Sequence, residues 1–191
     1  MSAVSRRGRS ALLIIDMINT FEFEDGASLA KQAAKALPHI VKLSDKCRHL
    51  KIPIVYCNDN FGRWRSDFQK VYQRCVRPES RGAAIATALR PTPSDYFILK
   101  PKHSAFFSTP LELLLRSMHV RRLILTGISG DGCVLCTATD AHIRDYAVTV
   151  ASDATASERA ASNRRALAHL REAVDDVEVV KTATLLKSLE R

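Results

Sequence analysis

Long apolar runs are missing from this sequence of 191 residues. The longest early run, Ala11 to Ile15, is interrupted at once by Asp16. Such a run is far shorter than the roughly 20 residues that cross a bilayer, and it is too short for the core of a signal peptide. We therefore expect a cytoplasmic protein that has no membrane partner.

Cysteines are few, and their number is odd, which excludes a complete disulfide framework of the kind found in small secreted proteins. We expect reduced thiols, at least one of which could act as a reactive thiolate. The five residues are Cys47, Cys57, Cys75, Cys133 and Cys136.

Basic residues are plentiful but are not gathered into a stripe. The formal net charge is +9, yet the arginines and lysines are spread along the chain and no aromatic residues alternate with them. Nucleic-acid binding requires a concentrated basic surface, so the sequence indicates no nucleic-acid partner and a solvated basic exterior.

Internal repeats, low-complexity tracts and Pro/Gly/Ser linkers are also absent. The length suits one domain, so we expect a single domain over residues 1–191, with a mobile start over residues 1–9. Six short apolar runs alternate with helical patterns, including a helix over about 28–50 that should break at Pro38. The runs are 11–15, 52–56, 96–99, 122–127, 147–151 and 177–180.

These runs lack strict polar alternation, as is typical of strands that are buried on both faces of a sheet. Strands that alternate with helices favour parallel pairing through right-handed crossovers. The predicted fold is therefore α/β: a three-layer α-β-α arrangement around a six-stranded, mainly parallel sheet of Rossmann-like order 3-2-1-4-5-6. Helices would cover both faces.

Polar residues follow four of the predicted strands at the point where each strand ends. They are Asp16, the pair Asn58 and Asp59, Lys100, and the loop 127–133. In an open parallel sheet, ligands bind beyond the carboxyl ends of the strands, where the strand order reverses. The four segments are thus expected to converge on one crevice.

Cys133 lies in a small-residue turn between a strand and a helix. The helix dipole would lower its thiol pKa from about 8.5, and unpaired N–H groups of the turn could bind an oxyanion. Asp16 could be a turn former or an acid/base, and Lys100 could be a surface lysine. Cys133 itself could be a small core residue. Together the three make a candidate triad, in which Lys100 supports the thiolate and Asp16 moves the proton.

The residues also resemble a known family, the isochorismatase-like cysteine hydrolases, which include nicotinamidases and N-carbamoylsarcosine amidases. The resemblance runs through almost the whole chain in the correct order. It is carried by LLIIDMINTF (12–21), IPIVYCND (52–59), LKPKHSAFFSTPLELLL (99–115), LTGISGDGCVLCTATDA (125–141), ASDAT (151–155) and VVKTATLL (179–186).

This resemblance implies that Asp16 is the acid/base, Lys100 the supporting lysine and Cys133 the nucleophile. It also implies a cis peptide between Ile128 and Ser129, and an oxyanion hole formed by the amides of Ser129 and Cys133. The implied reaction is cleavage of an amide, urea or carbamoyl C–N bond of a small molecule through a cysteine thioester. A homodimer or higher homo-oligomer is the implied assembly.

The sequence departs from the family pattern in two places. Gly130-Asp131 stands where members often have Thr-Asp. Asn58-Asp59-Asn60 replaces the Asp-x-His of metal-dependent nicotinamidases, and no histidine lies between His49 and His103. We therefore expect neither a metal nor another cofactor. Isochorismatases proper typically lack the cysteine, so Cys133 favours acyl chemistry, although an isochorismatase-type reaction stays an alternative.

Two functions from other classes remain open. Cys133 and Cys136 form a C-x-x-C, which could serve thiol–disulfide exchange, although thioredoxin-like motifs follow an early strand and this one comes late. Gly127, Gly130 and Gly132 follow a strand but do not have the G-x-G-x-x-G spacing of dinucleotide-binding loops.

Other side chains near the predicted crevice could bind the substrate. They are Phe21, Asn58, Trp64 and Phe106, with core packing as the alternative for the two phenylalanines and a subunit interface for Trp64. His103 and His142 are predicted to be structural, because neither has a spaced ligand or base partner in the sequence.

Overall fold

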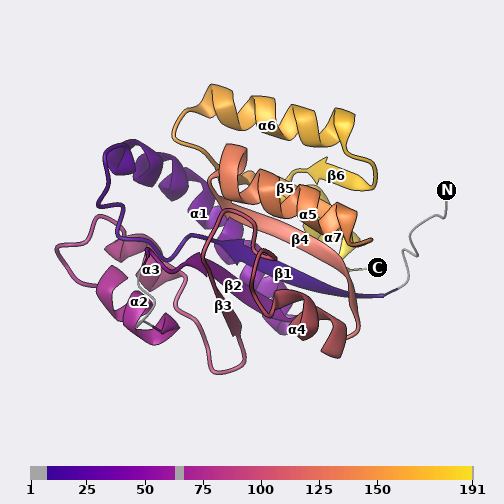
Figure 1. The fold of residues 1–191 in the computed structure, drawn as a ribbon, viewed down its shortest axis with the longest axis horizontal. Helices are drawn as coiled ribbons and strands as arrows, with labels where there is room; N and C mark the ends of the chain where they lie inside the picture. The colour runs from indigo at the N-terminus through magenta and orange to yellow at the C-terminus, as the bar shows by residue number, and fades with distance from the viewer. Residues whose placement is uncertain (1–7, 63–66, 191) are drawn as a thin grey trace.

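The structure is a computed structural model that describes residues 8–62 and 67–190. Within these ranges strands and helices alternate along the chain, as predicted (Figure 1). The strands are β1 (Arg9–Ile15), β2 (Ile54–Asp59), β3 (Tyr96–Lys100), β4 (Val120–Ile128), β5 (Ala147–Ala156) and β6 (Val177–Val180). The helices are α1 (Gly26–His49), α2 (Phe68–Cys75), α3 (Ala83–Ala88), α4 (Leu111–Ser117), the π-helical turn η1 (Gly130–Val134), α5 (Leu135–Ile143), α6 (Ala160–Ala173) and α7 (Thr182–Ser188).

The strands form one six-stranded sheet in the order β3-β2-β1-β4-β5-β6, and every neighbouring pair is parallel. The predicted α/β fold and strand order are thus confirmed. β1 lies centrally: its Leu13 pairs with Val55 on one side and with Leu125 on the other. The predicted mobile start, residues 1–9, lies outside the described residues apart from Gly8 and Arg9, and Arg9 already begins β1.

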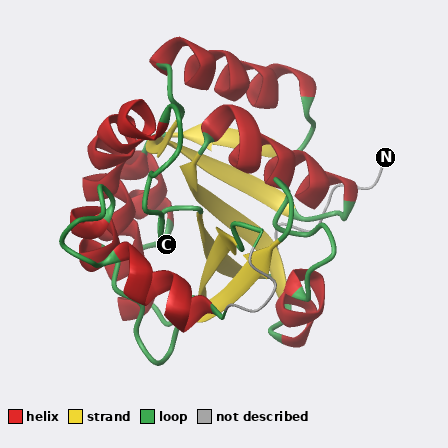
Figure 2. Cartoon of the chain, turned by 60° about the vertical axis from the view of Figure 1, so that its left-hand side comes forward, coloured by secondary structure: helices red, strands yellow, loops and turns green. Residues whose placement is uncertain are grey.

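Helices cover both faces of the sheet (Figure 2). Successive side chains of a strand point to opposite faces, so β1 contributes to two cores. Leu12 and Ile14 pack beneath α1, α2, α3 and α7, whereas Leu13 and Ile15 pack beneath α4, α5 and α6. Full burial of one such side chain contributes about 1.5–3 kcal/mol, which explains why β1 can be apolar at every position from 11 to 15.

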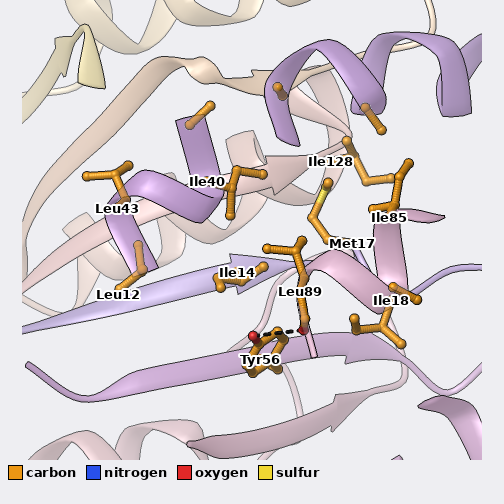
Figure 3. Close-up of a cluster of buried hydrophobic side chains, with 14 of the residues drawn as sticks. Leu12, Ile14, Met17, Ile18, Ile40, Leu43, Tyr56, Ile85, Leu89 and Ile128 are labelled. Carbon is orange, nitrogen blue, oxygen red and sulfur yellow. Dashed lines mark hydrogen bonds between the residues drawn. The ribbon is translucent and has the colours of Figure 1, made fainter. Parts of the chain in front are cut away.

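The first core extends beyond the sheet to the segments that follow β1. Met17 and Ile18 are fully buried there, beside Ile85 of α3 (Figure 3). The Tyr56 hydroxyl donates a hydrogen bond of 3.0 Å to the carbonyl of Leu89, at the end of α3 (Figure 3). The region between β2 and β3, which contains the short helices α2 and α3, is therefore anchored on the core.

α1 does not break at Pro38, so that prediction was wrong. The helix runs unbroken over 24 residues with Pro38 inside it. Proline removes the hydrogen bond to the carbonyl four residues earlier, and both Pro38 and Ala34 lie on the exposed face of α1, where water can satisfy that carbonyl. None of the described helices combines the length and the apolar character needed to span a membrane.

The carboxyl ends of β1 and β4 approach each other closely. Gly127 of β4 has a φ of +110°, and a Cβ atom built there would lie 2.1 Å from the carbonyl oxygen of Ile15. Only glycine fits such a contact and such a backbone conformation. The register between β4 and β5 also shifts at this point, between Leu125 and Gly127. Beyond the shift, Gly127 pairs with Thr155 and Ile128 with Ala156, so β5 extends to Ala156, five residues past the predicted end of that strand.

Candidate active site

Four strand ends meet at one edge of the sheet. Asp16 follows β1, Asp59 and Lys100 are the last residues of β2 and β3, and Cys133 lies in η1, after β4. β1 and β4 are neighbours in the centre of the sheet, and the chain continues from them in opposite directions, to β2 and to β5. The strand order therefore reverses between the carboxyl ends of β1 and β4. The predicted convergence of the polar segments is therefore present.

Asp16 holds a left-handed backbone conformation, with a φ of 53°. Aspartate tolerates this region better than most residues, and its backbone N–H still donates to the carbonyl of Cys57 at 2.9 Å. The turn directs the carboxylate toward β2 and β3. One oxygen, Oδ1, accepts a 2.7 Å hydrogen bond from the Asp59 amide, and the other lies 2.8 Å from Lys100 Nζ.

The Lys100 ammonium connects the other two members of the triad. Its Nζ pairs with Asp16 Oδ2 at 2.8 Å, donates to the carbonyl of Lys102 at 3.2 Å, and lies 3.5 Å from Cys133 Sγ. Three partners account for the three protons of an ammonium group. The side chain is fully buried, and Asp16 is only 5 % exposed. The structure therefore brings together the three residues predicted to be catalytic.

Burial and charge act on these groups in opposite directions. Burial raises the pKa of Asp16 even though Lys100 works to lower it. Burial works to lower the pKa of Lys100, but the charges of Asp16 and Cys133 outweigh burial and raise it. The pair consequently combines a carboxyl group that is easier to protonate than usual with a lysine that keeps its proton.

The expectation that the helix dipole lowers the thiol pKa of Cys133 was wrong. Burial, and next the negative charge of Asp16, raise this pKa to about 12 in spite of the nearby Lys100. A cysteine at a helix start feels the dipole only as a partial charge, whereas desolvation penalises the full charge of a thiolate. The resting sulfur is therefore a thiol that needs a base before it can attack.

The turn that carries Cys133 is braced from two sides. The Ser129 carbonyl accepts hydrogen bonds from the amides of Gly132 at 3.1 Å and Val134 at 3.0 Å, which close η1. The peptide bond between Ile128 and Ser129 is cis, at the place that the resemblance implied. From the other side, the Ser157 hydroxyl accepts from the Asp131 amide at 3.0 Å. The position of Cys133 is therefore set by both β4 and the segment before α6.

Sequence reasoning missed His103. Its ring atom Nδ1 lies 3.5 Å from Cys133 Sγ, within hydrogen-bonding range for sulfur, although the sequence suggested a structural histidine without a partner. The two residues are 30 positions apart, so only the fold brings them together. The signal that could have found it is its place three residues after Lys100, in the segment that leaves β3 at the ligand edge of the sheet.

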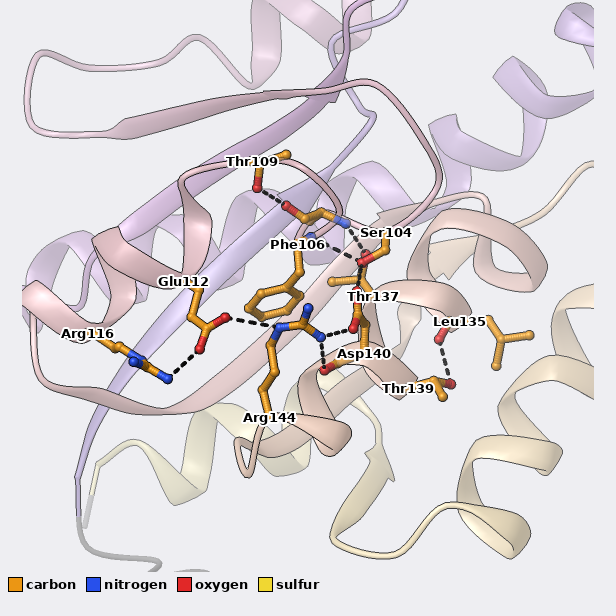
Figure 4. Close-up of polar contacts among 11 residues, drawn as sticks. Ser104, Phe106, Thr109, Glu112, Arg116, Leu135, Thr137, Thr139, Asp140 and Arg144 are labelled. Atoms are coloured by element: carbon orange, nitrogen blue, oxygen red, sulfur yellow. Dashed lines mark hydrogen bonds and ion pairs between the residues drawn. The ribbon is translucent and has the colours of Figure 1, made fainter.

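A chain of polar contacts fastens the segment after His103 to α5 (Figure 4). Ser104 bonds the carboxylate of Asp140, the Ala105 amide donates to Thr137 Oγ1 at 3.0 Å, and Asp140 in turn pairs with Arg144. Phe106, which was a candidate for substrate binding, is 5 % exposed and packs within this cluster. The structure thus places Phe106 in the core, the alternative that the sequence left open.

The remaining candidates for substrate binding are Phe21, Asn58 and Trp64, and the structure places the first two in the packed interior. Phe21 is fully buried in the first core. Asn58 is fully buried as well, and its Nδ2 donates a hydrogen bond of 2.7 Å to the carbonyl of Ile18. Its Oδ1 has no hydrogen-bond partner among the described residues. Trp64 lies outside the described residues. The contacts of Asn58 are those of a side chain that fixes the segment after β1.

The alternative chemistries have less support in the geometry. All five cysteines are free thiols, and the Cys133 sulfur contacts Lys100, His103 and the Asp16 carboxylate. Over residues 8–62 and 67–190, no group of three or more His, Cys, Asp or Glu side chains is arranged to hold a metal ion. The site is therefore best described by the buried ion pair and the thiol.

Comparison with known proteins agrees with this geometry. The family model of the isochorismatase domain matches residues 10–183. An uncharacterized isochorismatase family protein of Bacillus subtilis, YaaI, is 46 % identical over 157 residues, which cover 82 % of this chain and 86 % of YaaI. The ureidoacrylate amidohydrolase RutB of Cronobacter sakazakii is 29 % identical, with 77 % and 74 % covered.

Solved structures show the same relationship. N-carbamoylsarcosine amidase from Thermoplasma acidophilum superposes with a TM-score of 0.71 at 27 % identity, covering 91 % of this chain and 96 % of that one. The predicted enzyme class, an amidohydrolase of C–N bonds other than peptide bonds, is thereby confirmed at the level of the family. The chain belongs to the isochorismatase family, among its isochorismatase-like cysteine hydrolases.

Proposed function

We propose that this enzyme hydrolyses a C–N bond of a small amide, urea or carbamoyl compound through a thioester on Cys133. The observation that carries the proposal is the position of Lys100 Nζ, 2.8 Å from Asp16 Oδ2 and 3.5 Å from the Cys133 sulfur. A fully buried ammonium between a carboxylate and a thiol stabilises the thiolate that nucleophilic attack requires. Relatives named as an amidohydrolase and an amidase support the bond type.

The first half of the reaction forms the thioester. Asp16 accepts the thiol proton of Cys133, and the sulfur attacks the carbonyl carbon while the π electrons move to the oxygen. Backbone amides of Ser129 and Cys133 are the proposed donors to this oxyanion. When the intermediate collapses, the C–N bond breaks and Asp16 delivers its proton to the leaving nitrogen. The raised pKa of Asp16 suits a group that must both accept and release a proton near neutral pH.

The second half consumes water. A water molecule gives one proton to the Asp16 carboxylate as it attacks the thioester carbon. The C–S bond then breaks, and Asp16 passes this proton to the sulfur as the acid product leaves. Lys100 keeps its charge throughout, because its pKa is raised. Its ammonium therefore stabilises the thiolate both as nucleophile and as leaving group.

The test is ammonia release from a panel of amides, ureas and carbamoyl compounds. We expect at least one to be hydrolysed, and the Cys133→Ala variant to lose about 10⁴-fold or more of kcat/KM. Cys136→Ser is the matched control, because Cys136 lies next to the site on α5 and has no proposed role. If Cys133→Ala hydrolysed the substrate at the parent rate, the thioester mechanism would be wrong. Loss of activity in Cys136→Ser together with disulfide exchange by the parent would favour a redox function instead.

A further inference from the structure

The proton of the Cys133 thiol has two acceptors within reach, and only one has been given a role. Lys100 donates to the sulfur, so the thiol proton must point elsewhere. Asp16 lies on the buried side of the site, at 5 % exposure. His103 Nδ1 lies 3.5 Å from the sulfur, and the His103 side chain is exposed to solvent. The sulfur thus lies between a buried and a solvent-facing proton acceptor.

We propose that His103 is a second catalytic proton-transfer residue, which exchanges the Cys133 thiol proton with solvent. This inference rests on the proposed function for its role in turnover, but the proton exchange itself concerns the free enzyme. The proton leaves Sγ for the lone pair of Nδ1, which produces a thiolate beside the Lys100 ammonium and an imidazolium. The imidazolium charge costs little because the ring is exposed, and Nε2 can pass a proton to water.

The placement of His103 is fixed by the fold, which distinguishes it from a mobile surface histidine. The residues that follow it are hydrogen-bonded to α5: Ser104 to Asp140, and the Ala105 amide to Thr137 Oγ1 at 3.0 Å (Figure 4). α5 continues directly from η1, the turn that holds Cys133. The backbone of His103 is therefore tied to the same element as the nucleophile, and the contact between Nδ1 and Sγ is preorganised.

The charges around this contact favour transfer to the histidine. Lys100 lies 3.5 Å from the sulfur and stabilises the thiolate, while the carboxylates of Asp16 and Asp59 lie 2.8 and 3.9 Å from Lys100 Nζ. Two carboxylates near one ammonium leave the site able to accommodate an additional positive charge on His103. The Lys102 side chain is exposed, so water screens its repulsion of the imidazolium.

The consequence is a pH dependence that follows His103 and not the thiol alone. By itself the Cys133 thiol has a pKa of about 12, so its reactivity would rise steadily through the neutral range. With His103 as acceptor, reactivity also depends on whether the imidazole is neutral, because only the neutral ring can accept the proton. Protonation of the ring removes the acceptor and the nucleophile together.

The experiment is alkylation of Cys133 by iodoacetamide between pH 5 and 9, followed by mass spectrometry in a Cys136→Ser background. We expect the parent to show a sigmoidal step within this range. In His103→Asn, whose amide matches the position of Nδ1 but does not titrate, the step should vanish and the rate at pH 7.5 should fall at least about 10-fold. His142→Asn, further along α5, is the matched control and should keep the parental profile.

Activity provides the second readout. For a substrate found in the amide panel, we expect His103→Asn to lower kcat/KM by about 100-fold and to remove the acid limb that matches the alkylation step. A His103→Asn enzyme with the parental pH profile of alkylation, or a parent without the step, would overturn the inference. Retained activity in Cys133→Ala would instead overturn the proposed function; the alkylation profile would still decide whether His103 shares the thiol proton.

Discussion

Replacing Lys100 by methionine should destabilise the protein more than any surface change, because it leaves the Asp16 carboxylate buried without its partner. Lys100 is fully buried and Asp16 is 5 % exposed, with 2.8 Å between Nζ and Oδ2. Removing one member of such a pair costs about 3–5 kcal/mol, since the other charge stays desolvated. A domain of ordinary stability, about 5–15 kcal/mol, survives this loss well enough to be measured.

Urea denaturation of four proteins measures the effect: the parent, Lys100→Met, Asp16→Asn and the double variant. We expect the double variant to recover about 2–3 kcal/mol relative to the sum of the single changes, because the neutral amide that replaces the Asp16 carboxylate no longer needs a cation. Lys102→Met is the matched control. Its side chain is exposed, so its free energy of unfolding should stay within about 0.5 kcal/mol of the parent.

The deficit of Lys100→Met should also depend on pH, with a definite sign. Without the ammonium, burial raises the folded-state pKa of Asp16 still further above the unfolded value of about 3.9. A carboxyl with a raised folded pKa favours folding below the unfolded pKa, and that advantage is lost as the pH rises through the folded pKa. The deficit should therefore be smallest near pH 4 and largest above pH 7. An equal deficit at both pH values, without recovery in the double variant, would refute the energetic coupling of the pair.

Two further predictions concern the framework of the site. Gly127→Ala should destabilise the fold by about 2 kcal/mol or more in urea denaturation, because its Cβ would lie 2.1 Å from the Ile15 carbonyl; Gly62→Ala, with nothing within 4 Å, should cost about 1–2 kcal/mol from its φ of 68° alone. Asp153→Ala should cost about 1–2 kcal/mol at pH 7, because Thr182 donates its amide at 2.8 Å and its hydroxyl at 2.7 Å to Asp153 Oδ1. These bonds outweigh burial and lower the pKa of Asp153, so its contribution is present above about pH 3.9 and is lost as the pH falls through the lower folded value. A gap that persists unchanged at pH 2.5 would contradict this.

The fold was predictable because its dominant signals are local. Each strand is a short apolar run, and alternation with helices restricts the sheet to parallel pairing. Pro38 misled the prediction, because a helix tolerates a proline more readily where the carbonyl that it leaves unpaired can reach water. Whether Ala34 faces solvent depends on how α1 packs on the sheet, which a local pattern does not contain.

The candidate site was predictable in its members but not in its energetics. Asp16 and Lys100 stood out because a charge directly after a buried strand is unusual, and both strands end at the ligand edge. His103 gave no such signal, since its contact with Cys133 joins residues 30 positions apart. The direction of the thiol pKa was also beyond the sequence, because it depends on how completely the surrounding segments exclude water from the sulfur.

A thiol pKa of about 12 restricts how this cysteine can react. At pH 7 this thiol is therefore almost entirely protonated. A mechanism that waits for spontaneous ionisation would add the cost of forming the thiolate to its barrier, so a neighbouring acceptor must take the proton before or during attack on the carbonyl carbon. The acceptor must then already touch the thiol, which is the arrangement found: a carboxylate held by Lys100 on one side and His103 Nδ1 at 3.5 Å on the other. Keeping the thiol protonated also slows adventitious oxidation, because oxidants react with the thiolate.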